Sequence, residues 1–238
     1  MSAKIGYFCA HNLTPMIFIL PFLAVLISSL IVLVFKPKNQ KSLKLLLAFS
    51  GAFLLALTFF ELLPEVFLNL GGKKISIFIL LGILLQITLE FFSKGAEHGH
   101  VHVDVKKNLF PLGLFLSLSL HAFVEGFPLS EKNTMLYGVL VHKIPIALIL
   151  SIFLFNSKIR TWKVTLFLIL FSIMTPLGSF LAQNFEAFKS YDNELNALAA
   201  GMFFHVSTTI IFESAQNHSF NIRKLIAIVL GMVVAYFI

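Results

Sequence analysis

Residues 15–35 read PMIFILPFLAVLISSLIVLVF and contain no charged side chain. A helix needs about 20 predominantly apolar residues to cross the hydrocarbon core of a membrane, so this stretch has the length of a membrane span. The runs are continuous and show no alternation of apolar and polar residues, which favours helices over the strands of a barrel. Further apolar stretches of similar length follow at 44–63, 74–92, 109–129, 135–155, 164–183, 195–215 and 222–238. The sequence therefore predicts an all-α membrane protein, an eight-transmembrane-helix bundle.

The composition supports this fold class. Hydrophobic residues make up 58% of the chain and charged residues 12%, with a mean hydropathy of +0.92. Soluble domains are about 25% charged, so a soluble globular protein and a disordered one are both excluded. Eight spans leave only short connections, so residues 1–238 are expected to form a single transmembrane domain. The net charge of +7 is not gathered into a basic, aromatic-interleaved patch, so the expected partner is the lipid bilayer and not nucleic acid.

The distribution of basic residues predicts the orientation. The connections after the first, third, fifth and seventh spans hold most of the 18 Lys and Arg residues. Cytoplasmic connections carry an excess of Lys and Arg, so both termini should lie outside. We expect a multi-pass protein of the cell membrane. A bacterial inner membrane is favoured, because no targeting segment is recognised.

Ionisable residues inside the spans are candidates for function, because burying them in a membrane is costly. His121 and Glu125 are four residues apart in the fourth span, so they share one face of a helix. His142 lies near the middle of the next span. Two imidazoles and a carboxylate suit a borderline cation such as Zn²⁺. The alternative is that these side chains only hydrogen-bond neighbouring helices.

Two further span residues and one loop are weaker candidates for metal binding. Glu61 and His205 could each supply a fourth ligand or stand along the path of the ion, although single polar residues in spans more often bond a neighbouring helix. The connection at residues 93–108 is expected to be a cytoplasmic loop that contains histidines. Its alternating His98, His100 and His102 form a candidate tract for loose metal collection.

Four motifs together resemble the ZIP family of divalent-metal transporters, and the resemblance covers essentially the whole chain. In order along the spans they are Leu62-Leu-Pro-Glu65, His121-Ala-Phe-Val-Glu-Gly126, His142-Lys-Ile-Pro145 and Thr175-Pro-Leu-Gly178. The resemblance implies a metal-transporter domain with a centre between the fourth and fifth spans that often holds two metals. Carried over by position, His121, Glu125 and His142 match ligands of the first metal.

The chain departs from the family pattern at the second metal. The family has Asn where this chain has Ala122 and Glu or Asn where it has Lys143. The family has Glu at the two positions that are Ile146 and Thr175 here. Two unit charges 4 Å apart interact by roughly 4 kcal/mol at an effective dielectric of about 20, so Lys143 would repel a second divalent ion. One hypothesis is a site for a single metal in which Lys143 replaces the second cation. The other is that a pair of Lys143 with Glu125 has replaced metal altogether.

The resemblance implies a transporter of divalent metal and not an enzyme. Zn²⁺ is the favoured substrate, Fe²⁺ and Mn²⁺ are alternatives, and no organic cofactor is expected. A homodimer is left open. Two other functions remain as alternatives. One is a metal sensor or scaffold without flux. The other is an intramembrane metal-dependent hydrolase, for which the chain lacks a His-Glu-x-x-His motif.

Overall fold

The structure is a computed structural model that describes residues 3–37, 40–69, 72–96, 110–130, 134–213 and 222–238. Every regular element in these ranges is a helix, which confirms the predicted all-α class. The elements are α1 (Ala3–Phe35), α2 (Gln40–Leu57), the π-helical turn η1 (Thr58–Leu62), α3 (Leu63–Asn69), α4 (Lys73–Ser93), α5 (Leu112–Val124), α6 (Met135–Phe155), α7 (Thr161–Asn184), α8 (Glu186–Lys189), α9 (Asp192–Glu213) and α10 (Ile222–Tyr236).

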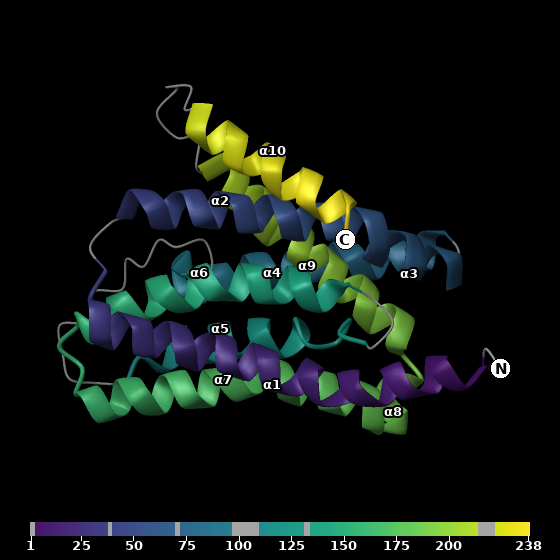
Figure 1. The fold of residues 1–238 in the computed structure, drawn as a ribbon, viewed down its shortest axis with the longest axis horizontal. Helices are drawn as coiled ribbons and strands as arrows, with labels where there is room; N and C mark the ends of the chain where they lie inside the picture. The colour runs from purple at the N-terminus through teal and green to yellow at the C-terminus, as the bar shows by residue number, and fades with distance from the viewer. Residues whose placement is uncertain (1–2, 38–39, 70–71, 97–109, 131–133, 214–221) are drawn as a thin grey trace.

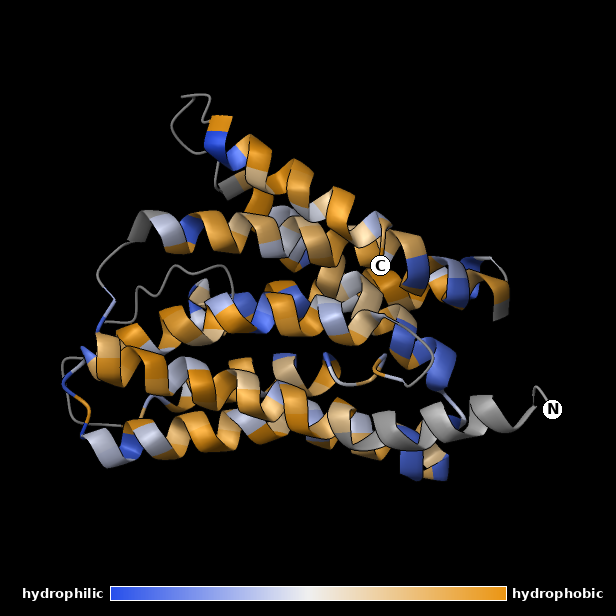
Figure 2. Ribbon diagram, in the orientation of Figure 1, coloured by the Kyte–Doolittle hydropathy of each residue, from blue (hydrophilic) through white to orange (hydrophobic). Residues whose placement is uncertain are grey.

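Six segments of the described chain are long and apolar enough to cross a membrane, so the protein is a multi-pass membrane protein. They are Met16–Phe35, Ser42–Leu68, Lys73–Ser93, Met135–Phe155, Thr161–Asn184 and Asp192–Phe212. The two other predicted spans correspond to shorter helices, α5 with 13 residues and α10 with 15. Hydrophobic residues cover most of the length of the helices (Figure 2).

Several helix ends differ from the prediction. The first span was expected to begin at residue 15, but α1 begins at Ala3. The second span was expected to end at residue 63, but α2 continues through η1 and α3 to Asn69. Pro64 has no backbone N–H to donate, so the turn before it widens to a π-helical one. In this turn the N–H of Leu63 donates to the carbonyl oxygen of Thr58. The fourth span was expected to run to residue 129, but α5 ends at Val124.

The long helices can be grouped into two sets by the neighbours along which they pack. The first helix set consists of α1, α5, α6 and α7, in which α1 packs along α6 and α7, and α5 packs along α7. The second helix set consists of α2, α4, α9 and α10, in which α4 packs along α9 and α2 packs along both α9 and α10. The sets meet where α2 contacts α6 and where α4 contacts α5 (Figure 1).

Close backbone contacts hold helices together within each set. A Cβ atom at Gly178 of α7 would lie 1.9 Å from the carbonyl oxygen of Phe123 in α5. A Cβ atom at Gly201 of α9 would lie 2.0 Å from the carbonyl oxygen of Ile79 in α4. Between the sets, the atoms nearest to a Cβ atom at Gly138 of α6 would be leucine side chains of α2, at 3.1 Å and beyond. At this position the sets meet through side chains.

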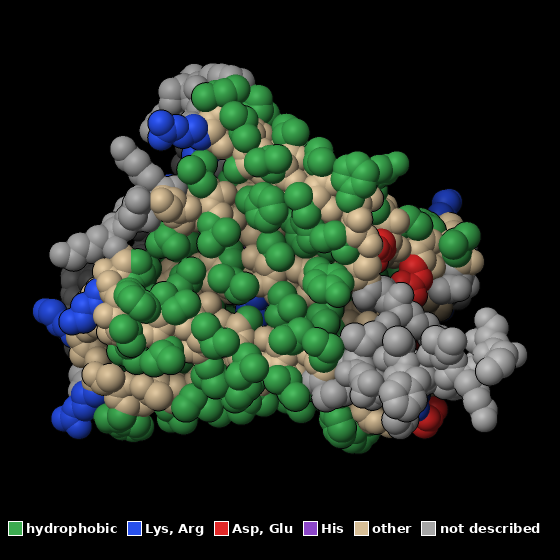
Figure 3. Space-filling view, in the orientation of Figure 1, with side chains coloured by type: hydrophobic (Ala, Val, Ile, Leu, Met, Phe, Trp, Pro, Cys, Tyr) green, Lys and Arg blue, Asp and Glu red, His purple; other side chains and the backbone are tan. Residues whose placement is uncertain are grey.

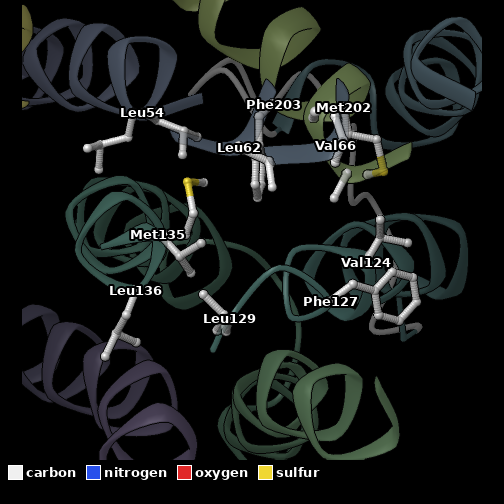
Figure 4. Close-up of a cluster of buried hydrophobic side chains, with 14 of the residues drawn as sticks. Leu54, Leu62, Val66, Val124, Phe127, Leu129, Met135, Leu136, Met202 and Phe203 are labelled. Carbon is white, nitrogen blue, oxygen red and sulfur yellow. The ribbon is translucent and has the colours of Figure 1, made fainter. Parts of the chain in front are cut away.

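The buried apolar side chains form one cluster that both helix sets share and another that belongs mainly to the first set. One cluster, which we call the shared cluster, combines residues of both sets, among them Leu62, Met135 and Phe203 (Figure 4). A second cluster, including Leu118, Leu150 and Phe167, comes mainly from the first helix set. The shared cluster also takes in Val124 and Phe127, near the end of α5, so the two sets are joined most extensively where α5 ends and α6 begins.

Charged side chains are separated along the bundle. On the visible face, Lys and Arg gather at the end where α1 leads into α2 and α6 leads into α7, while Asp and Glu appear toward the opposite end (Figure 3). α1 begins and α10 ends toward this second end (Figure 1). The separation follows the asymmetry of basic residues on which the predicted orientation depends.

Candidate metal site

The end of α5 places two candidate ligands one helical turn apart. The backbone N–H of Glu125 donates to the carbonyl oxygen of His121 at 3.0 Å, after which the chain turns away. A Cβ atom at Gly126 would lie 2.3 Å from the carbonyl oxygen of Thr175 in α7. This close approach requires glycine, and Pro128 follows two residues later, so the helix ends at the carboxylate.

The third candidate ligand lies on α6. His142 and Lys143 follow each other in this helix and are both buried. A hydrophilic band interrupts α6 near its middle (Figure 2). The helix begins after Thr134, whose backbone N–H donates to Oε2 of Glu61 at 3.0 Å and whose hydroxyl donates to Oε1 of the same carboxylate.

His121, Glu125 and His142 form a compact buried group. One ligand atom from each lies within 4.8 Å of the other two, and no other such group of three occurs in the described ranges. The side chains are 5%, 2% and 2% exposed, respectively. Zn²⁺ binds nitrogen and oxygen ligands at about 2 Å. Side-chain rotations that shift each ligand atom by about an ångström would let all three bind one ion. The group has the donor types that a borderline divalent cation prefers.

Lys143 forms a hydrogen bond with the same carboxylate. Its Nζ atom donates to Oε2 of Glu125 at 2.6 Å and lies 5.3 Å from the ring centroid of Phe171. The hydroxyl of Thr175 donates to the carbonyl oxygen of Ala122 at 2.8 Å and lies 3.3 Å from the same Oε2. The other oxygen, Oε1 of Glu125, is buried without a hydrogen-bond partner among the described residues. It retains its lone pairs for a cation.

Sequence reasoning missed one residue of the site, Gln86. The Nδ1 atom of His121 lies 2.9 Å from Oε1 of this glutamine, which is completely buried on α4. The available signal was an amide in an otherwise apolar span. Thr175 was noticed only as a departure from the family pattern, although its hydroxyl contacts the candidate carboxylate.

The other predicted ligands lie apart from the buried group. Glu61 bonds Thr134 at the start of α6, and Nδ1 of His205 lies 3.8 Å from Oε2 of Glu90. The predicted metal-collecting tract, His98, His100 and His102, lies outside the described residues. The structure thus brings together three of the five predicted ligands in the membrane.

Comparisons with known proteins identify relatives of this chain. Zinc transporter ZIP1 of Danio rerio is 32% identical over 139 residues, which cover 53% of this chain and 46% of the relative. Zinc transporter ZIP1 of Takifugu rubripes is 30% identical over 131 residues, covering 50% and 43%. Protein zntD of Dictyostelium discoideum is 27% identical over 150 residues, covering 54% and 22%. The chain spans less than half the length of these relatives.

A family model described as ZIP zinc transporter matches residues 94–238, which is more than half of the chain. The match contains α5, α6 and α7, the helices that carry the buried His–Glu–His group and its neighbouring lysine and threonine. The resemblance seen in the four sequence motifs is therefore confirmed, and the chain belongs to the ZIP zinc transporter family.

Proposed function

We propose that this protein moves divalent metal cations into the cytoplasm and that His121, Glu125 and His142 bind the ion near the middle of the membrane. The observation that carries the proposal is the burial of these three side chains with ligand atoms within 4.8 Å of one another. Zn²⁺ is the favoured substrate because two imidazoles and one carboxylate suit its ligand preference, and two of the relatives are named zinc transporters. Fe²⁺ and Mn²⁺ are alternatives.

The proposed topology has eight spans and both termini outside, with residues 1–238 as one transporter domain. It adds α5 and α10 to the six candidate spans. The separation of basic from acidic side chains along the bundle supports this orientation (Figure 3). Residues 93–108 would then face the cytoplasm, where the histidine tract would receive the ion.

Lys143 is proposed to replace the second metal of the family's centre. Its ammonium lies 2.6 Å from one oxygen of Glu125, so the carboxylate is already neutralised on that side. A second divalent ion would be repelled by this charge. The other carboxylate oxygen remains for a single ion, so we assign one metal per transport cycle to this site.

The two helix sets suggest how the ion passes through. All three proposed ligands belong to the first helix set, and the shared cluster covers the side toward the ends of α5 and α3. Rocking of the first helix set against the second would separate this cluster and open the site to the outside. The reverse movement would open it toward the cytoplasm. Side-chain contacts between the sets can break and reform more easily than the close backbone contacts within each set.

Glu61 and His205 are proposed to line the path and not to bind the ion in this conformation. Glu61 lies in the π-helical turn near Glu65, and His205 lies beside Glu90 near the end of α4. Each would meet the ion before or after it reaches the central group. The bond from Thr134 to Glu61 would have to break if the carboxylate met the ion.

The test is uptake of Zn²⁺ into proteoliposomes loaded with a fluorescent zinc reporter. Wild-type protein should accumulate the ion, and Glu125→Ala should reduce uptake to the level of empty liposomes. Glu186→Ala is the matched control, because this carboxylate is exposed on α8 and pairs with nearby Lys189 at 3.1 Å. Uptake by Glu125→Ala at the wild-type rate would overturn the proposal.

The buried ion pair favours one second candidate, a metal sensor or scaffold without flux. In that case the attraction between Lys143 and Glu125 keeps the central site closed to metal. The same liposomes distinguish the two functions. Folded wild-type protein that takes up none of Zn²⁺, Fe²⁺ and Mn²⁺ would support the sensor or scaffold.

A further inference from the structure

Gln86 is a buried amide whose presence packing does not explain. It lies on α4 between apolar residues and is completely buried. Its Nε2 group has no hydrogen-bond partner among the described residues. Burying an amide group without satisfying it is costly, so an apolar side chain would serve helix packing better. The contact that Gln86 does make should therefore account for the residue.

That contact is with a proposed metal ligand. The Oε1 atom of Gln86 lies 2.9 Å from Nδ1 of His121. A carbonyl oxygen only accepts hydrogen bonds, so Nδ1 must carry the proton of the neutral imidazole. The lone pair then lies on Nε2, where it can bind a cation. Hydrogen-bond acceptors of this kind fix the tautomer and the ring orientation of metal-binding histidines and strengthen them as ligands.

The bond also crosses the interface between the helix sets. Gln86 belongs to α4 of the second set and His121 to α5 of the first. The same two helices share a second polar contact, in which the hydroxyl of Ser117 donates to the carbonyl oxygen of Leu89 at 2.5 Å. Movement of one set against the other would withdraw the amide from the imidazole. His121 would thus be oriented in this conformation and released in another.

We propose that Gln86 is a positioning residue that prepares His121 to bind the transported metal ion in the conformation described here. This inference rests on the proposed function, because it assumes that His121 is a ligand. Gln86 itself would not contact the ion. Metal affinity should depend on an acceptor at position 86, even though every proposed ligand remains in place.

The experiment measures Zn²⁺ affinity of the purified full-length protein by competition with a chelator, together with the visible absorption spectrum of bound Co²⁺. Gln86→Met keeps the length of the side chain and removes the acceptor. It should weaken Zn²⁺ binding by about 10–100-fold, the range typical for loss of a ligand's hydrogen-bond partner, and change the Co²⁺ spectrum. Gln86→Glu retains an acceptor and should restore both. Size-exclusion chromatography establishes that each variant is folded.

Ser117→Ala is the matched control, because it removes a second side-chain hydrogen bond between α4 and α5 without touching a proposed ligand. Its affinity and spectrum should equal those of the wild type. If Gln86→Met does not fold, Gln86→Asn answers the same question, since it keeps the amide but withdraws it from His121 by one methylene.

The outcomes separate this inference from the proposed function. Wild-type affinity in a folded Gln86→Met protein would overturn the inference and leave the proposed function intact. Equal losses in Gln86→Met and Ser117→Ala would also overturn it, because a general effect on helix packing would then explain both. Wild-type protein that binds Zn²⁺ no better than His121→Ala would overturn the proposed function itself, and the inference with it.

Discussion

The Nζ atom of Lys143 lies 2.6 Å from Oε2 of Glu125, and the two side chains are only 3% and 2% exposed. The pair joins α6 to α5 within the first helix set. A buried ion pair recovers by mutual attraction only part of the hydration that its charges lose, so apolar residues are often at least as stabilising. The pair therefore points to a purpose beyond stability, and its carboxylate is the one that we propose as a metal ligand.

Replacing Lys143 by Met should lower the stability of the metal-free protein and raise its affinity for Zn²⁺. Without metal, Glu125 becomes a buried charge without its cation, so we expect the protein to lose about 3–5 kcal/mol of stability. Zn²⁺ affinity should rise by at least about tenfold, because no ammonium competes for the carboxylate. Thermal unfolding with and without Zn²⁺ and chelator competition measure the two effects.

Lys189→Met is the control for this prediction. Lys189 pairs with Glu186 at 3.1 Å where both side chains are largely exposed, and exposed pairs contribute little to stability. Neither the unfolding temperature nor the affinity should change. A Lys143→Met protein with unchanged Zn²⁺ affinity would show that the lysine does not compete with the ion.

Substitution of individual histidines should distinguish ligands from residues along the path. His142→Ala removes a proposed ligand and should weaken Zn²⁺ binding by more than about 100-fold, beyond the effect of losing a ligand's hydrogen-bond partner. His205→Ala should leave the affinity near that of the wild type, because the imidazole of His205 lies beside Glu90 between α4 and α9. Titration of both purified variants with Zn²⁺ measures the difference.

This comparison addresses a role for His205 that the sequence left open. A loss in His205→Ala as large as that in His142→Ala would make His205 a ligand. The two helix sets would then have to move far enough to bring α9 to the central group. A loss of uptake without a loss of affinity would place His205 on the path of the ion.

The sequence predicted most of the fold because a membrane imposes a simple length requirement on each helix. It did not predict that α5 ends at Val124, because this end depends on the contact of Gly126 with the backbone of α7 as well as on the nearby Pro128. A contact between distant segments leaves no periodic signal in either one. The end of the second span was missed for a different, local reason, because the helix widens before Pro64 and continues past it.

The sequence predicted the ionisable residues of the candidate site. His121 and Glu125 were paired from their spacing, and Lys143 was expected near the same carboxylate. Gln86 was missed because it is uncharged and its partner lies 35 residues away in the sequence. The contact of His205 with Glu90 was missed because each residue was considered within its own span.

The close contact between α5 and α7 should be required for transport. A Cβ atom at Gly178 would lie 1.9 Å from the carbonyl oxygen of Phe123, so Gly178→Ala must push the helices apart. Overpacking of this kind costs about 1–3 kcal/mol and occasionally more. It should also withdraw the Thr175 hydroxyl from Glu125, which lies 3.3 Å away. We expect a lower unfolding temperature and loss of Zn²⁺ uptake in proteoliposomes.

Gly113→Ala makes the same chemical change on α5, at a position where an added Cβ atom meets nothing within 4 Å. Alanine is favoured over glycine in a helix by up to about 1 kcal/mol, so this variant should be at least as stable as the wild type and transport at the same rate. If Gly178→Ala also kept the wild-type unfolding temperature and uptake, the backbone contact would not be what holds Glu125 in position. The ion pair with Lys143 would then have to orient the carboxylate by itself.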